Sequence, residues 1–200
     1  MTVDPDTRLL GRTPGLPEEH FVHDGLITKR LVRSMALAQL RPNPATKSRG
    51  EMLWDLGTGA GSIAVEWCRS DPEMRAVGVE RKADRAANAR ANAANLTLPG
   101  QFEVIESAIC DALDELPDPD AVFIGGGATR EIVDRCLARL TSGGRIVVHG
   151  VTIDTEILIA QLHGELGGEL VRVHVETAEP IGKLRGFAAA RAISGWTYWL

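Results

Sequence analysis

Cysteine is scarce in this sequence, which contains only Cys68, Cys110 and Cys136 among its 200 residues. All three lie inside apolar periodic stretches, a pattern typical of buried thiols in a reducing compartment rather than of a disulfide framework. No apolar run approaches the roughly 20 residues needed to cross a bilayer, and the polar N-terminus MTVDPDTRLLGRTPG has no signal-peptide core. We therefore expect a single-domain cytoplasmic protein without a membrane partner.

Signatures of several enzyme classes are also missing. The sequence contains no G-x-S-x-G, no P-loop and no C-x-x-C, so hydrolase, kinase and redox functions have no support. His20 and His23 are close together but no third ligand is evident, so we expect no metal site. The formal net charge of −5 gives no general attraction for phosphate backbones, which argues against a nucleic-acid partner.

Positive charge is nevertheless concentrated near the N-terminus. Residues 1–50 contain eight lysine or arginine residues and five acidic residues. Thr28 is placed to cap a helix in this region, which Arg41-Pro42-Asn43-Pro44 would end. Two interpretations are open: ordinary solvated surface charge, or an anion-facing lid over substrate and cofactor. We accordingly divide the chain into a lid segment, 1–50, and a core, 51–200.

From residue 51 onward, short apolar runs alternate with helical patterns, which predicts an α/β fold with a doubly wound, mostly parallel sheet. The last two runs are joined by AEPIGKLR, which is too short for a crossover helix, so we expect an antiparallel C-terminal hairpin. Thr129 is expected to cap one helix, and Asp154 or Thr155 another. The seven expected strands are Met52–Leu56, Arg75–Glu80, Phe102–Glu106, Ala121–Ile124, Arg145–His149, Leu170–Thr177 and Gly186–Ile193.

The strongest local motif is the glycine-rich turn after the first expected strand, which reads D-x-G-x-G-x-G. Glycines there let the backbone turn sharply and approach a ligand, and the next helix offers free N–H groups to a carboxylate. The dinucleotide fingerprint G-x-G-x-x-G fails, because Ser62 occupies the place of its third glycine. A simple tight connection is the alternative interpretation. The candidate ligand-binding residues of this motif are Asp55, Gly57, Thr58, Gly59, Ala60 and Gly61.

Glu80 strengthens the ligand interpretation. It closes the second strand about twenty residues after the glycines, where a carboxylate can accept hydrogen bonds from both hydroxyls of a ribose. Ser107 and Ala108 follow the third strand, where an adenine edge would rest. The bare backbone of Gly125-Gly126-Gly127 would let a bulky substrate come close to the cofactor. Taken alone, Glu80 is equally compatible with a surface acid that ends a strand.

Together these features favour a seven-stranded, class I S-adenosylmethionine-dependent methyltransferase. The sheet of a dinucleotide dehydrogenase usually continues with parallel strands, whereas an antiparallel hairpin closes the methyltransferase sheet. The fourth strand lacks the N/D-P-P-[YF] tetrapeptide found where amino nitrogens of bases or of glutamine are methylated. Methylation of bases is therefore disfavoured.

Five segments carry a more specific resemblance: GLPEEHFVHDGLITKRLVRSMALAQL, DLGTGAGSIAVEW, GVER, DAVFIGGG and GGRIVVHGVTIDTE. In these segments the sequence resembles the decarboxylating precorrin carbon-15 methyltransferases of cobalamin biosynthesis, and the resemblance extends over most of the chain. The opening G-[IL]-P-[DE]-[DE]-x-F and the I-T-K before the first helix are more specific than the glycine motif, which all methyltransferases of this class share.

This resemblance implies an activity and its partners. It implies transfer of a methyl group from S-adenosylmethionine to carbon 15 of precorrin-6B, an anionic tetrapyrrole, with loss of the ring-C acetate carboxyl as carbon dioxide. It also implies cofactor contacts from Thr28, the Gly57–Gly61 turn, Glu80 and Ala108. Such enzymes occur either as separate proteins or as the C-terminal half of a fused protein whose N-terminal half methylates carbon 5, and the relatives suggest a homotetramer.

The sequence departs from the family pattern at two places. Where relatives often have G-D-A after the third strand, this chain has Glu106-Ser107-Ala108, so the backbone N–H of Ala108 would replace an acidic contact to adenine. The family's N-A-V-T-L-E-T stretch reads HGVTIDT from His149 onward, which changes the polar groups that face the substrate.

For the substrate side we expect charge-assisted pairs between substrate carboxylates and Lys29, Arg33 and Lys183. His149 is a candidate for proton transfer because the ordinary pKa of histidine lies near 6.5, with a purely structural histidine as the alternative. Two other functions stay open: a methyltransferase of the same fold that acts on RNA or another small molecule, and a catalytically silent nucleoside-binding domain.

Overall fold

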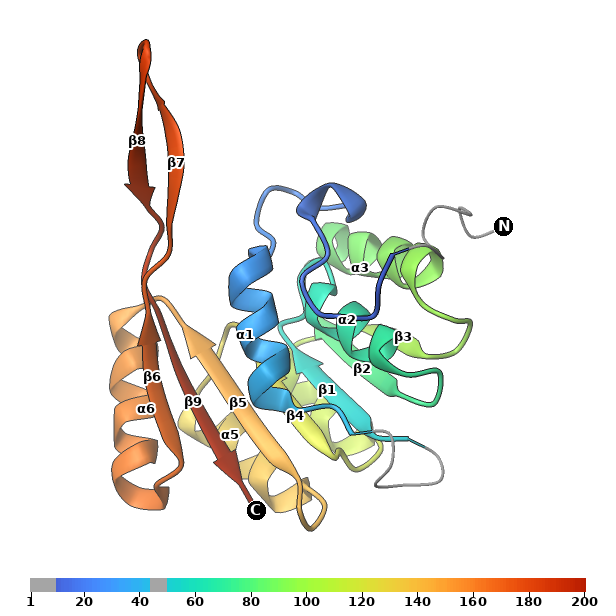
Figure 1. Ribbon diagram of the computed structural model, residues 1–200. Coiled ribbons are helices and arrows are strands. Elements are labelled where there is room, and N and C mark those ends of the chain that lie inside the picture. The colour runs from blue at the N-terminus through green and yellow to red at the C-terminus, as the bar shows by residue number, and fades with distance from the viewer. Residues whose placement is uncertain (1–9, 44–49) are drawn as a thin grey trace.

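The structure is a computed structural model that describes residues 10–43 and 50–200, and its centre is a seven-stranded sheet (Figure 1). The strands are β1 (Met52–Leu56), β2 (Arg75–Glu80), β3 (Phe102–Glu106), β4 (Ala121–Ile124), β5 (Arg145–Gly150), β6 (Glu169–Val173), β7 (Glu176–Ile181), β8 (Leu184–Ala189) and β9 (Ile193–Trp199). The helices are η2 (Glu18–His20), α1 (Arg30–Leu40), α2 (Ser62–Ser70), α3 (Ala83–Leu96), α4 (Ile109–Ala112), η4 (Leu113–Glu115), α5 (Arg130–Arg139) and α6 (Ile153–Leu166).

The sheet has the order β3-β2-β1-β4-β5-β9-β6, and β9 runs antiparallel to both of its neighbours. The first five strands pair in parallel. Their positions confirm the sequence prediction, except that β5 continues to Gly150, one residue beyond the expected end. Strand order reverses between β1 and β4, and in open α/β sheets ligands bind in the crevice at such a point.

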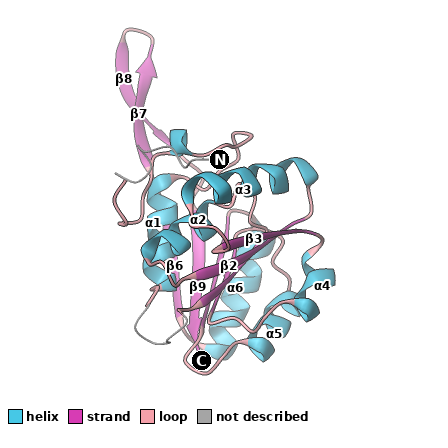
Figure 2. Cartoon of the chain, turned by 90° about the vertical axis from the view of Figure 1, so that its right-hand side faces the viewer, coloured by secondary structure: helices cyan, strands magenta, loops and turns pink. Residues whose placement is uncertain are grey.

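The C-terminal strands differ from the sequence prediction. The strand expected over 170–177 is shorter, and its partner in the sheet is β9 rather than the segment 186–193. The residues between them form β7 and β8, a separate two-stranded hairpin that projects away from the sheet (Figures 1 and 2). The antiparallel closure of the sheet is confirmed. The predicted turn is also present, but it lies at the tip of the projecting hairpin.

Helices cover both faces of the sheet (Figure 2). On one face α1, α2 and α3 pack against the strands, in a core that includes Leu37, Trp67 and Phe123. On the other face α4, α5 and α6 enclose a second core, which includes Trp54 and Trp196. Successive strand residues alternate between these two cores, as the period of two in a strand requires.

A buried ion pair ties the N-terminal segment to the core. The Glu66 carboxylate of α2 accepts hydrogen bonds from Nε of Arg33 in α1 and from the backbone N–H groups of Gly15 and Leu16. The side chains of Arg33 and Glu66 are 0 % and 2 % exposed, so the pair is desolvated. On the far side of this segment, Asn92 exchanges two hydrogen bonds with the backbone of Val22.

The N-cap residues of α1 and α6 differ from those predicted from the sequence. The N-cap of α1 is Lys29 rather than Thr28, and it makes no side-chain capping bond. The N-cap of α6 is Thr152, whose hydroxyl accepts from the N–H of Thr155, so the helix begins before the predicted caps. Thr129 caps α5 as predicted, because its hydroxyl accepts from the N–H of Ile132.

The three thiols are free, and Cys68 and Cys136 are buried as expected, while Cys110 is half-buried. Burial raises the pKa of Cys136 to about 12, which keeps this thiol protonated at neutral pH. Within residues 10–43 and 50–200, no helix combines the length and the apolar character needed to cross a bilayer.

Candidate cofactor and substrate site

The glycine-rich turn lies at the carboxyl end of β1, where it leads into α2. The N–H groups of Gly57 and Thr58 both donate to the carbonyl of Val79, at 2.9 and 3.1 Å, which fixes the turn against β2. Gly57 has a φ of +73°, and an added Cβ would lie 2.9 Å from the carbonyl oxygen of Gly126. Only glycine fits this position without displacing the backbone after β4.

Asp55 holds the turn from inside. One oxygen of its buried carboxylate, Oδ2, accepts from the hydroxyl of Thr58 at 2.6 Å and from the N–H of Ala64 at 3.2 Å. Burial raises the pKa of Asp55 to about 6, against the effect of these two hydrogen bonds and with a smaller contribution from the charge of Glu80. Asp55 therefore fixes the shape of the turn.

Glu80 stands at the carboxyl end of β2 beside the turn. Its Oε2 accepts from the N–H of Gly59 at 3.0 Å, and its Oε1 accepts from the N–H of Lys82 at 2.9 Å. Each carboxylate oxygen can accept more than one hydrogen bond, so both remain capable of holding a ribose hydroxyl. An added Cβ at Gly59 would have no atom within 4 Å, which leaves open space next to this carboxylate.

Ser107 and Ala108 lie next to Glu80, as the sequence predicted from the ends of neighbouring parallel strands. The N–H of Ser107 donates to the backbone carbonyl of Glu80 at 3.0 Å, and Ala108 is exposed at the start of α4. Ala60 is buried, and its carbonyl accepts from Nδ2 of Asn92 at 2.8 Å. The turn, the carboxylate and the open surface beside them therefore fit the amino acid and nucleoside parts of S-adenosylmethionine.

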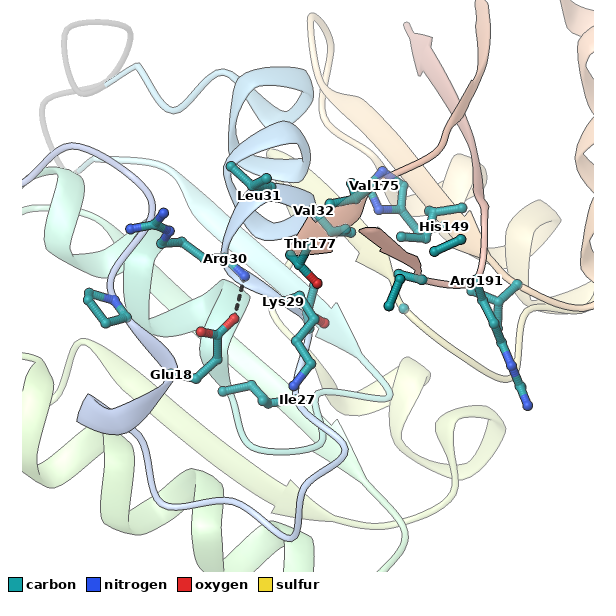
Figure 3. Close-up of a pocket in the computed structure, with 18 of the residues that line it drawn as sticks. Glu18, Ile27, Lys29, Arg30, Leu31, Val32, His149, Val175, Thr177 and Arg191 are labelled. Atoms are coloured by element: carbon teal, nitrogen blue, oxygen red, sulfur yellow. Dashed lines mark hydrogen bonds between the residues drawn. The ribbon is translucent and has the colours of Figure 1, made fainter. Parts of the chain in front are cut away.

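A cavity of about 830 Å³ opens beside the turn, on the β4 and β5 side of the crevice. Gly125 lines this cavity, and the next residue, Gly126, is the one that contacts the turn at Gly57. Glu18 and Lys29 lie on one side of the cavity, and His149 and Arg191 on the other (Figure 3). A substrate in the cavity would therefore adjoin a cofactor on the turn.

The cavity wall carries charges of both signs. Glu18, Glu19 and Glu179 line it together with Lys29, Arg30 and Arg191, so no general positive potential favours an anion. One of these groups is already engaged, because Oε1 of Glu18 accepts from the backbone N–H of Arg30 at 2.6 Å (Figure 3). Attraction for a carboxylate must come from individual cations.

Several predicted site residues meet at this cavity and others do not. Thr28 and Lys29 line it. Arg33 is fully buried, and its guanidinium is hydrogen-bonded to Glu66 and to the carbonyls of Leu16 and Thr28. The prediction that Arg33 pairs with a substrate carboxylate is therefore wrong. Lys183 lies at the turn of the β7–β8 hairpin and is not among the lining residues.

Sequence reasoning missed Arg191 and Gln39. Arg191 reaches the cavity because it lies where the chain returns from the hairpin to the sheet. The sequence prediction places this residue inside a strand over 186–193. Gln39 lies on α1, far from any motif, and its Oε1 is 2.7 Å from Nε2 of His149. No local pattern connects residues that are 110 positions apart.

His149 lines the cavity and is almost fully buried. It is 5 % exposed, and its ring meets Phe123 edge-on, with 5.2 Å between ring centroids. Burial lowers the pKa of His149 to about 4, so the imidazole is neutral at pH 7. Among the described residues, no group of three or more histidine, cysteine, aspartate or glutamate side chains is arranged to hold a metal ion.

Comparison with known proteins identifies the family of this chain. Residues 19–199 match the family model described as a precorrin methyltransferase domain. The chain belongs to this family. Its fold, with six parallel strands and β9 antiparallel in a seven-stranded sheet, is that of the S-adenosylmethionine-dependent methyltransferases.

Individual relatives of this precorrin methyltransferase domain are similar over nearly its whole length. It is 39 % identical over 199 residues to the precorrin-6Y C(5,15)-methyltransferase [decarboxylating] of Sinorhizobium, covering 99 % of this chain but 47 % of that protein. A Sulfolobus acidocaldarius protein named probable cobalt-precorrin-6B C(15)-methyltransferase (decarboxylating) is 29 % identical, and the match covers 88 % of this chain and 92 % of that one.

A solved structure is also close to this domain. The C-terminal domain of precorrin-6Y C5,15-methyltransferase from Rhodobacter capsulatus superimposes with a TM-score of 0.88 at 41 % identity, covering 96 % of this chain and all of that one. The chain spans about half the length of the Sinorhizobium relative and is similar throughout to a C-terminal domain.

Proposed function

We propose that this domain transfers the methyl group of S-adenosylmethionine to carbon 15 of precorrin-6B and removes the ring-C acetate carboxyl as carbon dioxide. The observation that carries the proposal is the crevice between β1 and β4. There the glycine turn and Glu80 adjoin a cavity of about 830 Å³, in a chain of the precorrin methyltransferase family. A cavity of this size is in the range of small-molecule sites.

The cofactor contacts follow from the order of the strand ends. The glycine turn and the N-terminus of α2 would hold the amino acid part, Glu80 the ribose hydroxyls, and Ser107 with the N–H of Ala108 the adenine. Thr28 would approach the cofactor from the cavity side. Nothing in this arrangement requires a metal ion.

When bound, S-adenosylmethionine supplies an electrophilic methyl group on a sulfonium sulfur. The protein's part is mainly to position the substrate carbon in line with that methyl group, because alignment of reactants contributes up to about 7–11 kcal/mol in model systems. Gly126 leaves room for this approach, since an added Cβ there would meet no atom within 4 Å. His149, which lines the cavity, is the candidate for holding or moving a proton near carbon 15.

Lys29 and Arg191 are the cations that we assign to substrate carboxylates. Both are exposed and line the cavity, whereas Arg33 is buried and Lys183 lies at the hairpin tip. Lys29→Ala should raise KM for precorrin-6B much more than it weakens cofactor binding. The same measurement on Lys183→Ala decides whether the hairpin tip reaches the substrate, and an unchanged KM in Lys29→Ala would contradict the assignment.

The transferase activity itself is tested by incubating the protein with methyl-labelled S-adenosylmethionine and precorrin-6B. We expect label in the tetrapyrrole. Label that enters RNA with a steep salt dependence would instead favour an RNA methyltransferase. Cofactor binding without transfer to any tetrapyrrole would favour a silent nucleoside-binding domain.

The projecting hairpin supports a homo-oligomer, which the family suggests to be a tetramer. Ile181 and Leu184 pair across it and are 65 % and 76 % exposed, and Phe187 is 76 % exposed. A two-stranded hairpin is marginally stable alone and gains stability from added strands or packing. Leu184→Asp should lower the molar mass in light scattering, with Lys183→Asp as the polar control. A monomeric wild type would contradict the proposal.

The longer relatives suggest the context of the reaction. Since the domain covers about half of the Sinorhizobium relative and resembles a C-terminal domain, we assign to it the carbon-15 half of a C5,15-methyltransferase. Carbon-5 methylation would then belong to another domain, fused or separate. The three free thiols agree with a reducing compartment such as the cytoplasm.

A further inference from the structure

One ring nitrogen of His149 has no partner within the described part of the chain. Nε2 lies 2.7 Å from Oε1 of Gln39, whereas Nδ1 is buried and makes no hydrogen bond. A carboxamide oxygen can only accept, so the proton of the neutral ring resides on Nε2. Nδ1 is therefore left with its lone pair, at a residue that lines the substrate cavity.

Three elements hold the ring in this orientation. Gln39, on α1, is itself buried and faces the Nε2 edge. Gly195, the partner of His149 on β9, makes room for the same edge, since an added Cβ would lie 3.0 Å from Cδ2 and 3.1 Å from Nε2. The edge of Phe123, on β4, packs against the ring. The arrangement is specific to one ring orientation and one tautomer.

Leaving a buried acceptor unpaired costs free energy, and a hydrogen-bond donor on a ligand would recover it. Burial also disfavours the imidazolium form, so Nδ1 stays an acceptor at neutral pH. A carboxylate cannot donate to such an atom, and its negative charge would be placed beside a lone pair. The groups that fit are hydrogen-bond donors, such as a ring N–H.

We propose that Gln39 is a positioning residue that holds His149 in the Nε2–H tautomer, so that Nδ1 accepts a hydrogen bond from a ring N–H of the bound tetrapyrrole. The identity of that donor rests on the proposed function, whereas the tautomer does not. The contact would orient the macrocycle at the end of the cavity opposite Lys29 (Figure 3). Carboxylates of the substrate would be directed away from His149.

The first measurement needs no substrate. Nitrogen-15 chemical shifts of His149 in the full chain should show an unprotonated Nδ1 and a protonated Nε2 at pH 7. Gln39→Leu removes the acceptor at similar size and should shift part of the population to the Nδ1–H tautomer. A wild-type ring protonated at Nδ1, or a Gln39→Leu ring with the wild-type shifts, would overturn the proposal.

The second measurement is the Kd for precorrin-6B from tryptophan fluorescence, which separates binding from turnover. Gln39→Leu should bind it about tenfold more weakly, while its Kd for S-adenosylmethionine stays unchanged. Thr197→Val is the matched control, because Thr197 is buried and its hydroxyl has no partner among the described residues. It should change neither Kd nor the shifts of His149.

The outcomes separate this inference from the proposed function. A changed tautomer with unchanged precorrin-6B affinity would overturn the contact to Nδ1. A wild type that binds precorrin-6B without turnover would contradict the proposed function and leave the affinity comparison valid. A wild type that does not bind precorrin-6B would overturn both the function and the tetrapyrrole contact, and the shifts alone would then decide the role of Gln39.

Discussion

At the level of single residues, Glu80 connects the backbone of the glycine turn to the expected position of the ribose. Its two oxygens already accept from the N–H groups of Gly59 and Lys82, so the side chain is oriented before a ligand arrives. Little further ordering is needed for it to accept from two hydroxyls.

Glu80→Gln should therefore weaken S-adenosylmethionine binding by about ten- to a hundredfold, because a charge-assisted acceptor is replaced by an amide. Titration calorimetry measures the affinity. Glu106→Gln is the matched control, since Glu106 pairs with Glu80 across β2 and β3 but is exposed. Equal affinity of Glu80→Gln and the wild type would remove Glu80 from the cofactor site.

His149 also gives the protein a pH-dependent stability. Its folded-state pKa of about 4 lies below the ordinary value near 6.5, so the unfolded chain takes up the proton first as the pH falls. The contribution of the neutral ring to stability is complete above pH 6.5 and is lost toward pH 4. Relative to His149→Gln, the wild type should lose about 2 to 3 kcal/mol of unfolding free energy between pH 7 and pH 4.5.

Urea unfolding at the two pH values measures this difference. The comparison with His149→Gln cancels the contributions of the other titrating groups, provided that the substitution leaves their surroundings unchanged. An equal pH dependence in both proteins would mean that His149 is protonated or exposed in the folded state.

At the level of elements, the turn between β1 and α2 serves packing on one side and ligand binding on the other. Gly61 has a φ of +76°, and an added Cβ would lie 2.7 Å from Cε1 of Phe102. Gly59 has a φ of +57°, but its added Cβ would meet nothing within 4 Å.

Gly61→Ala should therefore destabilise the fold by about 1 to 3 kcal/mol beyond the strain of its backbone, because it overpacks the core. Gly59→Ala should cost only the left-handed strain of about 1 to 2 kcal/mol but should weaken cofactor binding, since its methyl group enters the ligand space. Denaturant unfolding and cofactor titration distinguish the two. The same loss of stability in both variants would contradict the assignment of Gly61 to core packing and of Gly59 to the ligand side of the turn.

The N-terminal segment depends on Glu66, which bonds Arg33 and two backbone N–H groups. Glu66→Ala leaves the buried guanidinium with carbonyl partners only and should cost about 3 to 5 kcal/mol of unfolding free energy. Glu165→Ala, which breaks an exposed pair with Arg130, should change stability little. A small effect of Glu66→Ala in urea unfolding would mean that the segment is held mainly by its apolar contacts.

Strands β1 to β5 could be predicted from sequence because each is a short apolar run bounded by turn residues. The same signal failed near the C-terminus, where alternation continues through β6 into the exposed hairpin. Alternation alone does not say which sheet a strand joins. The last strand, β9, was missed because the last expected strand ended at Ile193, where β9 begins.

Some residues of the candidate site could likewise be predicted from local sequence, and others could not. Asp55, the glycines and Glu80 belong to one turn and two strand ends, so their spacing predicted their proximity. Gln39 and Arg191 reach the cavity through tertiary packing and a long return of the chain, which no local spacing records. Arg33 was misassigned because charge in a sequence does not show which arginine is buried.

At the level of the whole molecule, the sheet brings two half-sites together. The β1 and β2 ends carry the features that fit a cofactor, and the β4 and β5 ends open into the substrate cavity. The N-terminal segment, held by the buried ion pair at Glu66, carries Thr28 and Lys29 to that cavity. Residues 1–9 and 44–49 of the expected lid lie outside the described part of the chain.

The central claim is the decarboxylating methylation of carbon 15, and the mass of the product tests it most directly. The purified protein is incubated with S-adenosylmethionine and precorrin-6B under nitrogen, and the tetrapyrrole is then analysed by mass spectrometry. We predict the gain of one methyl group and the loss of one carbon dioxide. Unaltered substrate in a sample with confirmed cofactor binding would contradict the account.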